Sequence, residues 1–158
     1  LIENIHAVDT TFFSYEQEIY CFTYDLDHNS LLFLKLNPKS MKLSFSSNNP
    51  INTDIGSARM AGNILHRNQK YLRVSQDCNN IYGKALVFHQ FQIKWPHYQE
   101  KFIKKITTDN IPVNSRKKYY GIHTYNETSH YEVVDLKYNH FNLLELYYRI
   151  KRKILKLI

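Results

Sequence analysis

Two segments of the chain repeat one pattern at a spacing of 52 residues, and this repeat restricts the fold more than any other feature. Residues 12–25 read FFSYEQEIYCFTYD and residues 64–77 read ILHRNQKYLRVSQD. The shift keeps identical and apolar positions in register: Gln17 with Gln69, Asp25 with Asp77, Phe22 with Val74, Leu34 with Leu86 and Leu36 with Phe88. A repeat of this length is one supersecondary unit that buries its apolar face against neighbouring copies.

Each copy reads as three short strands separated by polar turns. Polar and apolar residues alternate within the segments, and turn residues interrupt them too often for helices. The predicted strands are 12–14, 19–23 and 31–36 in the first copy, and 63–66, 71–75 and 84–89 in the second. Residues 37–57 and 96–118 are predicted to hold outer strands and long connections. A third, partial copy follows from residue 119, with a turn at 127–129 and a strand over 131–135.

A period near 50 residues with several short strands is typical of a β-propeller. The alternative is a β-sandwich of unrelated hairpins. Aromatic residues make up 15% of the chain, with 13 Tyr and 9 Phe. Such rings favour strands and also suit sugar-binding surfaces, so both explanations stay open. We therefore predict an all-β fold over residues 1–140.

The last 18 residues differ from the repeats. Leucine, isoleucine and tyrosine recur at helical spacing over residues 141–158, with five cations and no acid in the last ten. This pattern predicts a C-terminal basic amphipathic helix. It either contacts anionic lipid headgroups or packs against the strands. Since much of the net charge of +7 lies in this tail, a nucleic-acid-binding body is not indicated.

Several classes of protein are disfavoured by what the sequence lacks. No stretch approaches the roughly 20 apolar residues of a membrane-spanning helix. No secretory signal opens the chain, which begins at Leu1. Cys21 and Cys78 lack metal-site spacing, and neither a phosphate-binding loop nor another cofactor motif is present. We expect a cytoplasmic protein without cofactor or metal, peripheral at the membrane if the tail binds lipid.

Four motifs carry a resemblance to a known family: HAVDTTFF (6–13), GSARMAGNI (56–64), SQDCNNIYGKAL (75–86) and GIHTYN (121–126). Together they resemble the propeller domain at the N-terminus of plant glucosamine inositolphosphorylceramide transferase and its bacterial relatives from polysaccharide gene clusters. That domain is similar to the five-bladed propellers of arabinanases, xylosidases and fructan-processing enzymes. The resemblance spans about residues 3–136, which would be the last three blades. It therefore implies open blade edges that associate with other chains.

The resemblance also suggests where function lies, because propellers bind ligands where their innermost strands meet. The candidate ligand-binding residues are Asp9, Arg59, Asn63, Gln76, Asp77, Tyr82, His123 and Tyr125. Asp9 matches the position of an aspartate that tunes the catalytic acids in the related glycosidases. It is the one candidate for a catalytic residue, and a weak one. The general acid Glu expected near residues 59–62 is missing, so whether the chain is an enzyme stays open.

Other roles compete for several of these residues. Asp77 is equally suited to cap a turn through its side-chain oxygens. Arg59 fits a structural ion pair, and His123 fits a hydrogen bond to a neighbouring blade. The resemblance implies glycan binding or processing in cell-surface polysaccharide or glycolipid biosynthesis. The alternative is a non-catalytic propeller that binds partner proteins.

Overall fold

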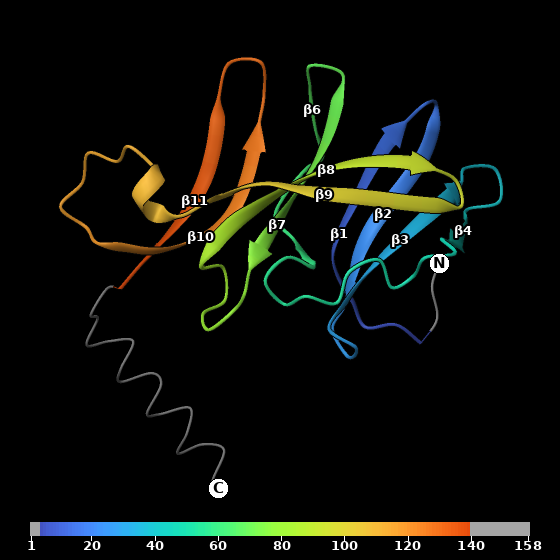
Figure 1. Cartoon of the computed structure of the whole chain (residues 1–158), viewed down its shortest axis with the longest axis horizontal. Coiled ribbons are helices and arrows are strands. Elements are labelled where there is room, and N and C mark those ends of the chain that lie inside the picture. The colour runs from blue at the N-terminus through green and yellow to red at the C-terminus, as the bar shows by residue number, and fades with distance from the viewer. Residues whose placement is uncertain (1–3, 140–158) are drawn as a thin grey trace, which may run out of the picture.

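The computed structural model describes residues 4–139, and apart from one short 3-10 helix their regular structure is β-strand (Figure 1). The first sheet contains β1 (Ala7–Tyr15), β2 (Glu18–Asp25), β3 (Ser30–Asn37) and β4 (Lys42–Phe45). The second contains β5 (Arg59–Met60), β6 (Leu65–Arg67), β7 (Lys70–Asp77), β8 (Ala85–Lys94) and β9 (His97–Ile106). The third contains β10 (Tyr119–Glu127) and β11 (Glu132–Tyr138), after the 3-10 helix η1 (Thr108–Asn110). The all-β prediction is confirmed.

The three sheets follow the predicted repeat. Each is antiparallel and none is closed, and apart from β5 and β6 the strands that are neighbours in the chain are neighbours in the sheet. The first strand of the second sheet is split into β5 and β6, which both pair with β7. In Figure 1 the sheets lie side by side, with the first on the right and the third on the left. The two copies that the sequence predicted therefore form separate sheets.

The register of the third strand in each copy corrects the sequence alignment. Ser30 pairs with Asp25, five residues before it, whereas Ala85 pairs with Asp77, eight residues before it. The second connection is thus three residues longer, and β8 is offset from β3 by 55 residues. A uniform 52-residue shift was wrong here, because extra loop residues change the offset without changing the sheet. The corrected offset aligns Phe33 with Phe88.

The largest core lies between the first and second sheets. Its aromatic residues come from both: Phe22 and Phe33 from the first, and Phe91 and Tyr98 from the second. Phe22, Phe33 and Phe91 are at most 2% exposed. Each such side chain contributes roughly 1.5–3 kcal/mol by leaving water. This apolar face makes the strands of the first sheet pack against those of the second.

A smaller core joins the second sheet to the third. Val74 and Phe88 of the second sheet bury Ile122 and Tyr125 of the third. The backbones approach closely at Gly62, where an added Cβ would lie 2.1 Å from the carbonyl oxygen of Tyr125. The Tyr125 N–H donates to the Ala61 carbonyl at 2.8 Å, across the two sheets. Gly62 also has φ +147°, a conformation that only glycine adopts readily.

The remaining sequence predictions concern the C-terminal helix, membrane-spanning helices and the two cysteines. The predicted basic helix over 141–158 lies outside the described residues. Within residues 4–139, no helix is long and apolar enough to cross a membrane. Both cysteines are free thiols, and burial raises the pKa of the Cys21 thiol to about 12. Cys78 is only half-buried.

Candidate functional site

Arg59 of β5 is the centre of a polar cluster that reaches all three sheets. Its Nε donates to the Asp9 carboxylate of β1, forming an ion pair. Its guanidinium carbon lies 4.8 Å from the centre of the Tyr82 ring and 5.6 Å from that of Tyr24. A cation over an aromatic ring is attracted by the negative face of the ring. Arg59 therefore connects the first sheet to the loop that follows β7.

Asp9 owes its position to a β-bulge. The pairing of β1 with β2 shifts between Val8 and Thr11, and Asp9 has φ +51° within that shift. Bulges redirect a side chain, and aspartate tolerates the left-handed conformation better than most residues. The sequence thus places a carboxylate on an irregular part of the strand, where it points to Arg59.

Tyr82 connects Arg59 to the third sheet. Its hydroxyl lies 2.5 Å from Nε2 of His123, and Nδ1 of His123 lies 3.3 Å from the Asp135 carboxylate. Lys137 Nζ donates to the Tyr82 carbonyl at 2.5 Å and lies 4.7 Å from the ring centre. The result is a continuous path of polar contacts from β1 to β11.

Glycines bring the Tyr82 loop against the third sheet. Gly83 has φ +63°, so the chain can turn directly after Tyr82. A Cβ at Gly121 would lie 2.4 Å from the Gly83 carbonyl oxygen, which shows how closely the two backbones approach. Tyr82 itself remains 40% exposed. The loop is therefore held in place while its aromatic side chain stays accessible to a ligand.

The cluster, which we call the Arg59 site, offers many directed polar groups. It contains two cations, two carboxylates, an imidazole and a phenol, contributed by Arg59, Lys137, Asp9, Asp135, His123 and Tyr82. The Arg59 and Asp9 side chains are 22% and 33% exposed. Donors and acceptors of both kinds therefore lie side by side at the surface, an arrangement suited to a ligand rich in hydroxyl groups.

Two other predicted site residues lie in buried structural networks. Gln76 donates from Nε2 to the Met60 carbonyl at 2.8 Å and so helps to hold β5 against β7. Asp77 accepts the Asn79 N–H at 2.9 Å and pairs with Lys105. Burial alone would raise the pKa of Asp77, but the contacts with Lys105 and Asn79 hold it below its usual value. These roles match the turn-capping interpretation of Asp77.

Tyr125 and Asn63 make their contacts outside the Arg59 cluster. Tyr125 is 4% exposed in the second core and donates its hydroxyl to Glu127 at 3.1 Å. The backbone N–H of Asn63 donates to the Asn126 side chain at 3.1 Å. Asn63 borders a separate hollow together with Glu127 and residues of their neighbouring turns. Of the eight predicted residues, the structure brings Asp9, Arg59, Tyr82 and His123 into one line of contacts.

Sequence reasoning missed Tyr24, Asp135 and Lys137 as neighbours of this cluster. Asp135 and Lys137 alternate on β11, the second strand of the partial third copy. The signal was available, because alternate residues on a strand point to the same face. What the sequence did not show was the bulged register that sets β11 against β10 at this position.

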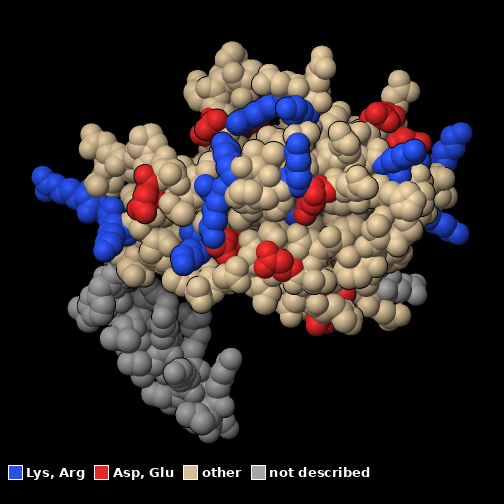
Figure 2. Space-filling view, in the orientation of Figure 1, with Lys and Arg blue, Asp and Glu red and all other residues tan. Residues whose placement is uncertain are grey.

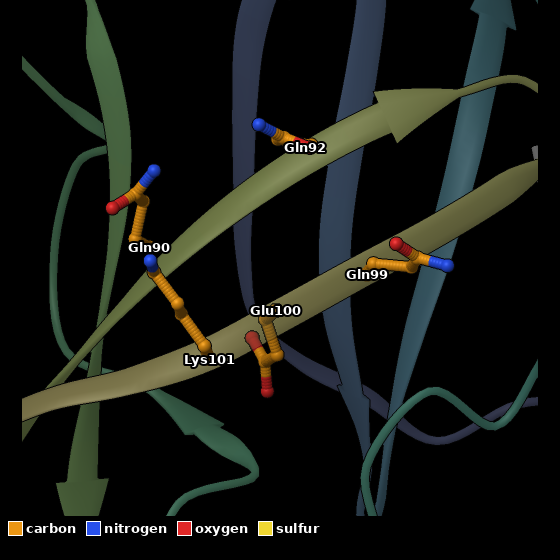
Figure 3. Close-up of a pocket in the computed structure, with 5 residues that line it drawn as sticks. All are labelled: Gln90, Gln92, Gln99, Glu100 and Lys101. Carbon is orange, nitrogen blue, oxygen red and sulfur yellow. The ribbon is translucent and has the colours of Figure 1, made fainter.

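One hollow of the described residues lies apart from this cluster, on the β8–β9 hairpin (Figure 3). It has a volume of about 180 Å³ and is lined by Gln90, Gln92, Gln99, Glu100 and Lys101 of the β8–β9 hairpin. The Glu100 carboxylate already accepts two hydrogen bonds of 2.7 Å from the Arg73 guanidinium. This hollow is also smaller than typical ligand pockets of about 300–1,000 Å³. We therefore regard the Arg59 site as a stronger candidate than this hollow.

Neither a metal site nor a known relative identifies the chemistry of the Arg59 site. Within residues 4–139, no group of three or more His, Cys, Asp or Glu side chains could hold a metal ion. In comparisons with known proteins, no family model, no curated protein and no solved structure matches the chain. The geometry of the described residues therefore carries the functional argument.

Proposed function

We propose that the chain is part of a five-bladed β-propeller that binds a glycan at the Arg59 site, in cell-surface polysaccharide or glycolipid biosynthesis. Two repeated antiparallel sheets and a partial third support the propeller. Each sheet runs in chain order and packs face to face on the next, as blades do. The first strands of all three sheets supply residues of the site.

The observation that carries the proposal is the convergence of polar groups from separate sheets. Asp9, Arg59 and His123 are far apart in the sequence, yet Tyr82 and Arg59 join them through direct contacts. Partly buried polar groups are costly unless they are satisfied by partners or ligands. Charged donors and acceptors form the strongest directed hydrogen bonds, and sugar hydroxyls accept and donate equally well.

Binding fits the site better than ordinary glycoside hydrolysis. Hydrolysis by inversion needs two carboxyl groups about 6.5–9.5 Å apart, one of them a protonated acid. Asp9 is ion-paired with Arg59, so its carboxylate already has a partner in the site. No glutamate occurs in residues 59–62, where the resemblance placed the general acid. The polar character of the site also favours a sugar over the protein partner of the alternative reading.

A glycan array with matched variants tests the proposal. Tyr82→Ala and Arg59→Gln should each remove the glycan signal of the parent protein, with little change in melting temperature. Tyr131→Ala is the control, because Tyr131 is 72% exposed and lies outside the site. Absence of any glycan signal from the parent protein would contradict the proposal, as would full binding by both site variants. A protein partner captured without glycan binding would support the alternative.

A further inference from the structure

A hollow between the first sheet and the β8–β9 turn is not used by the function above. Its lining includes Glu18 of β2, Lys35 of β3, Ser44 of β4 and Trp95 of the turn. It has a volume of about 520 Å³, within the range of about 300–1,000 Å³ that is typical of ligand pockets. We infer that this hollow, which we call the Trp95 hollow, binds one neutral hexose unit that stacks on the tryptophan ring, independently of the Arg59 site.

The β8–β9 turn is fixed against the first sheet, and this positions Trp95. The Ser46 hydroxyl donates to the Pro96 carbonyl at 2.7 Å. The Trp95 ring lies 5.9 Å from the Tyr20 ring and 6.0 Å from the Phe33 ring, centre to centre. Trp95 is half-buried, and it borders the hollow. An aromatic side chain that is already held in place loses little further freedom when a ligand binds to it.

The polar groups around the ring suit sugar hydroxyls. Lys35 Nζ donates to Glu18 at 2.8 Å and lies 5.9 Å from the centre of the Trp95 ring. Ser44 is exposed and lies opposite Lys35 in the β3–β4 pair. Within residues 4–139 the Trp95 indole N–H donates no hydrogen bond, and no polar side-chain atom there is buried without a partner, so this N–H reaches the surface. A hexose packs its C–H groups on an aromatic ring by dispersion, while its hydroxyls exchange hydrogen bonds with polar neighbours.

The charges around the hollow favour a neutral ligand over an anionic one. Glu18 and Lys35 form an ion pair, so neither adds an unbalanced charge to the hollow. Figure 2 shows lysine and arginine side chains gathered along the front of the molecule, where β9 crosses it in Figure 1. At the right, beside the β8–β9 turn, acidic and basic side chains both reach the surface. An anionic ligand is therefore attracted to the front of the molecule more than to the hollow.

The Trp95 hollow and the Arg59 site lie at opposite ends of β2. Tyr24 lies 5.6 Å from the Arg59 guanidinium carbon, whereas Glu18 lines the hollow. From Glu18 to Tyr24 the strand covers about 20 Å, at roughly 3.3 Å per residue. One hexose unit does not reach across that distance, so the two sites can be tested separately.

Tryptophan fluorescence reports on the hollow directly, because Trp95 is the one tryptophan of the chain. The probes are the methyl glycosides of glucose, galactose and mannose, titrated to high millimolar concentration. At least one should shift the emission to shorter wavelength in a saturable manner, because the sugar replaces water on the ring. Ser44→Tyr fills the hollow from an exposed position and should lose this shift. Ser14→Tyr is the matched control, an exposed strand serine outside the hollow, and should keep it.

The absence of a saturable shift with all three glycosides overturns the inference, as does a shift that Ser44→Tyr retains. Glucuronate is the anionic probe, and a shift with glucuronate alone overturns the assignment to a neutral sugar. If Ser44→Tyr melts at a lower temperature than the parent protein, acrylamide quenching of the unchanged protein decides instead. A bound glycoside must protect Trp95 from acrylamide, and unchanged quenching contradicts the inference.

The Arg59→Gln variant separates this inference from the proposed function. Contact with a single hexose unit in an open hollow has an affinity on the order of millimolar, which is lost when a glycan array is washed. The array therefore reports the Arg59 site, and the fluorescence titration reports the Trp95 hollow. Arg59→Gln should keep the fluorescence shift while losing the array signal. A shift that disappears in Arg59→Gln would show that the hollow is not an independent site.

Discussion

The two interfaces between sheets differ in how deeply each buries an arginine ion pair. The first interface joins the first and second sheets, and the second interface joins the second and third. In the first interface, Arg73 is fully buried and donates to both oxygens of Glu100. In the second, Arg67 is 35% exposed and pairs with Glu127. The first interface is also larger and more aromatic. The Phe33 ring lies within 5.0–6.5 Å of the rings of five others: Phe13, Tyr20, Phe22, Trp95 and Tyr98.

This difference indicates that the two interfaces respond differently to the same kind of change. A buried ion pair leaves a charge without a partner when one member is removed, whereas water replaces the lost partner at an exposed pair. The second interface depends instead on close backbone contact at Gly62 and on a smaller apolar core. The Arg59 site spans both interfaces, so its geometry depends on the weaker one. We expect the third sheet to separate before the first two do.

The largest expected effect comes from breaking the buried pair. Arg73→Ala should lower the free energy of unfolding by about 3–5 kcal/mol, because Glu100 is left charged in the core. Arg67→Ala, the matched change in the second interface, should cost about 1 kcal/mol or less. Urea unfolding at neutral pH measures both. Arg73→Met with Glu100→Leu should recover much of the loss, since apolar residues can replace a buried pair. Equal losses for the two arginine variants would contradict the comparison.

The close contact at Gly62 provides the next largest effect. Gly62→Ala should cost about 1–3 kcal/mol from backbone strain and also push the third sheet away. The added Cβ would meet the backbone of Tyr125, which cannot yield as a flexible side chain can. Hydrogen exchange should therefore accelerate at the Tyr125 amide more than at amides of β2. Gly56→Ala is the control, because its Cβ would meet mainly the flexible Asn79 side chain. Uniform acceleration in both sheets would argue against a separate opening of the third sheet.

The sequence predicted much of this architecture, and the misses have physical causes. Alternation and turn residues are local, so the three copies and most of their strands could be located within a few residues. The repeat did not show the extra loop residues before Ala85 or the splitting of the first strand at Gly62. For the site, Gln76 and Tyr125 were selected by their motifs, yet burial within a sheet decides their contacts. Lys137 was missed because its neighbour Tyr82 is 55 residues away.

A smaller difference should separate two phenylalanines at equivalent repeat positions. Phe33 and Phe88 are both fully buried, but Phe88 stacks edge-on with Tyr125 alone among the described rings. Each aromatic pair adds about 0.5–1.5 kcal/mol beyond the buried area. Phe33→Leu should therefore cost about 1–2 kcal/mol more than Phe88→Leu in urea unfolding. Both substitutions remove the same atoms, so each serves as the control for the other. A larger loss from Phe88→Leu would show that ring contacts do not distinguish the interfaces.

The smallest effect is a pH dependence that belongs to the first interface. Burial, together with the neighbouring charge of Arg73, lowers the pKa of His89, whose Nδ1 lies 3.4 Å from the Arg73 guanidinium. As the pH falls through about 6.5, the unfolded chain takes up a proton on this histidine while the folded chain does not, so stability decreases. One proton accounts for at most about 1.4 kcal/mol per pH unit.

Arg73 also holds the pKa of Glu100 below its usual value, against the opposing effect of burial. The Glu100 carboxylate therefore loses its contribution to stability only at lower pH. The free energy of unfolding measured from pH 7.5 to 5 should fall less steeply for His89→Gln than for the parent protein. Parallel slopes for the two proteins would mean that the loss of stability in acid does not come from His89.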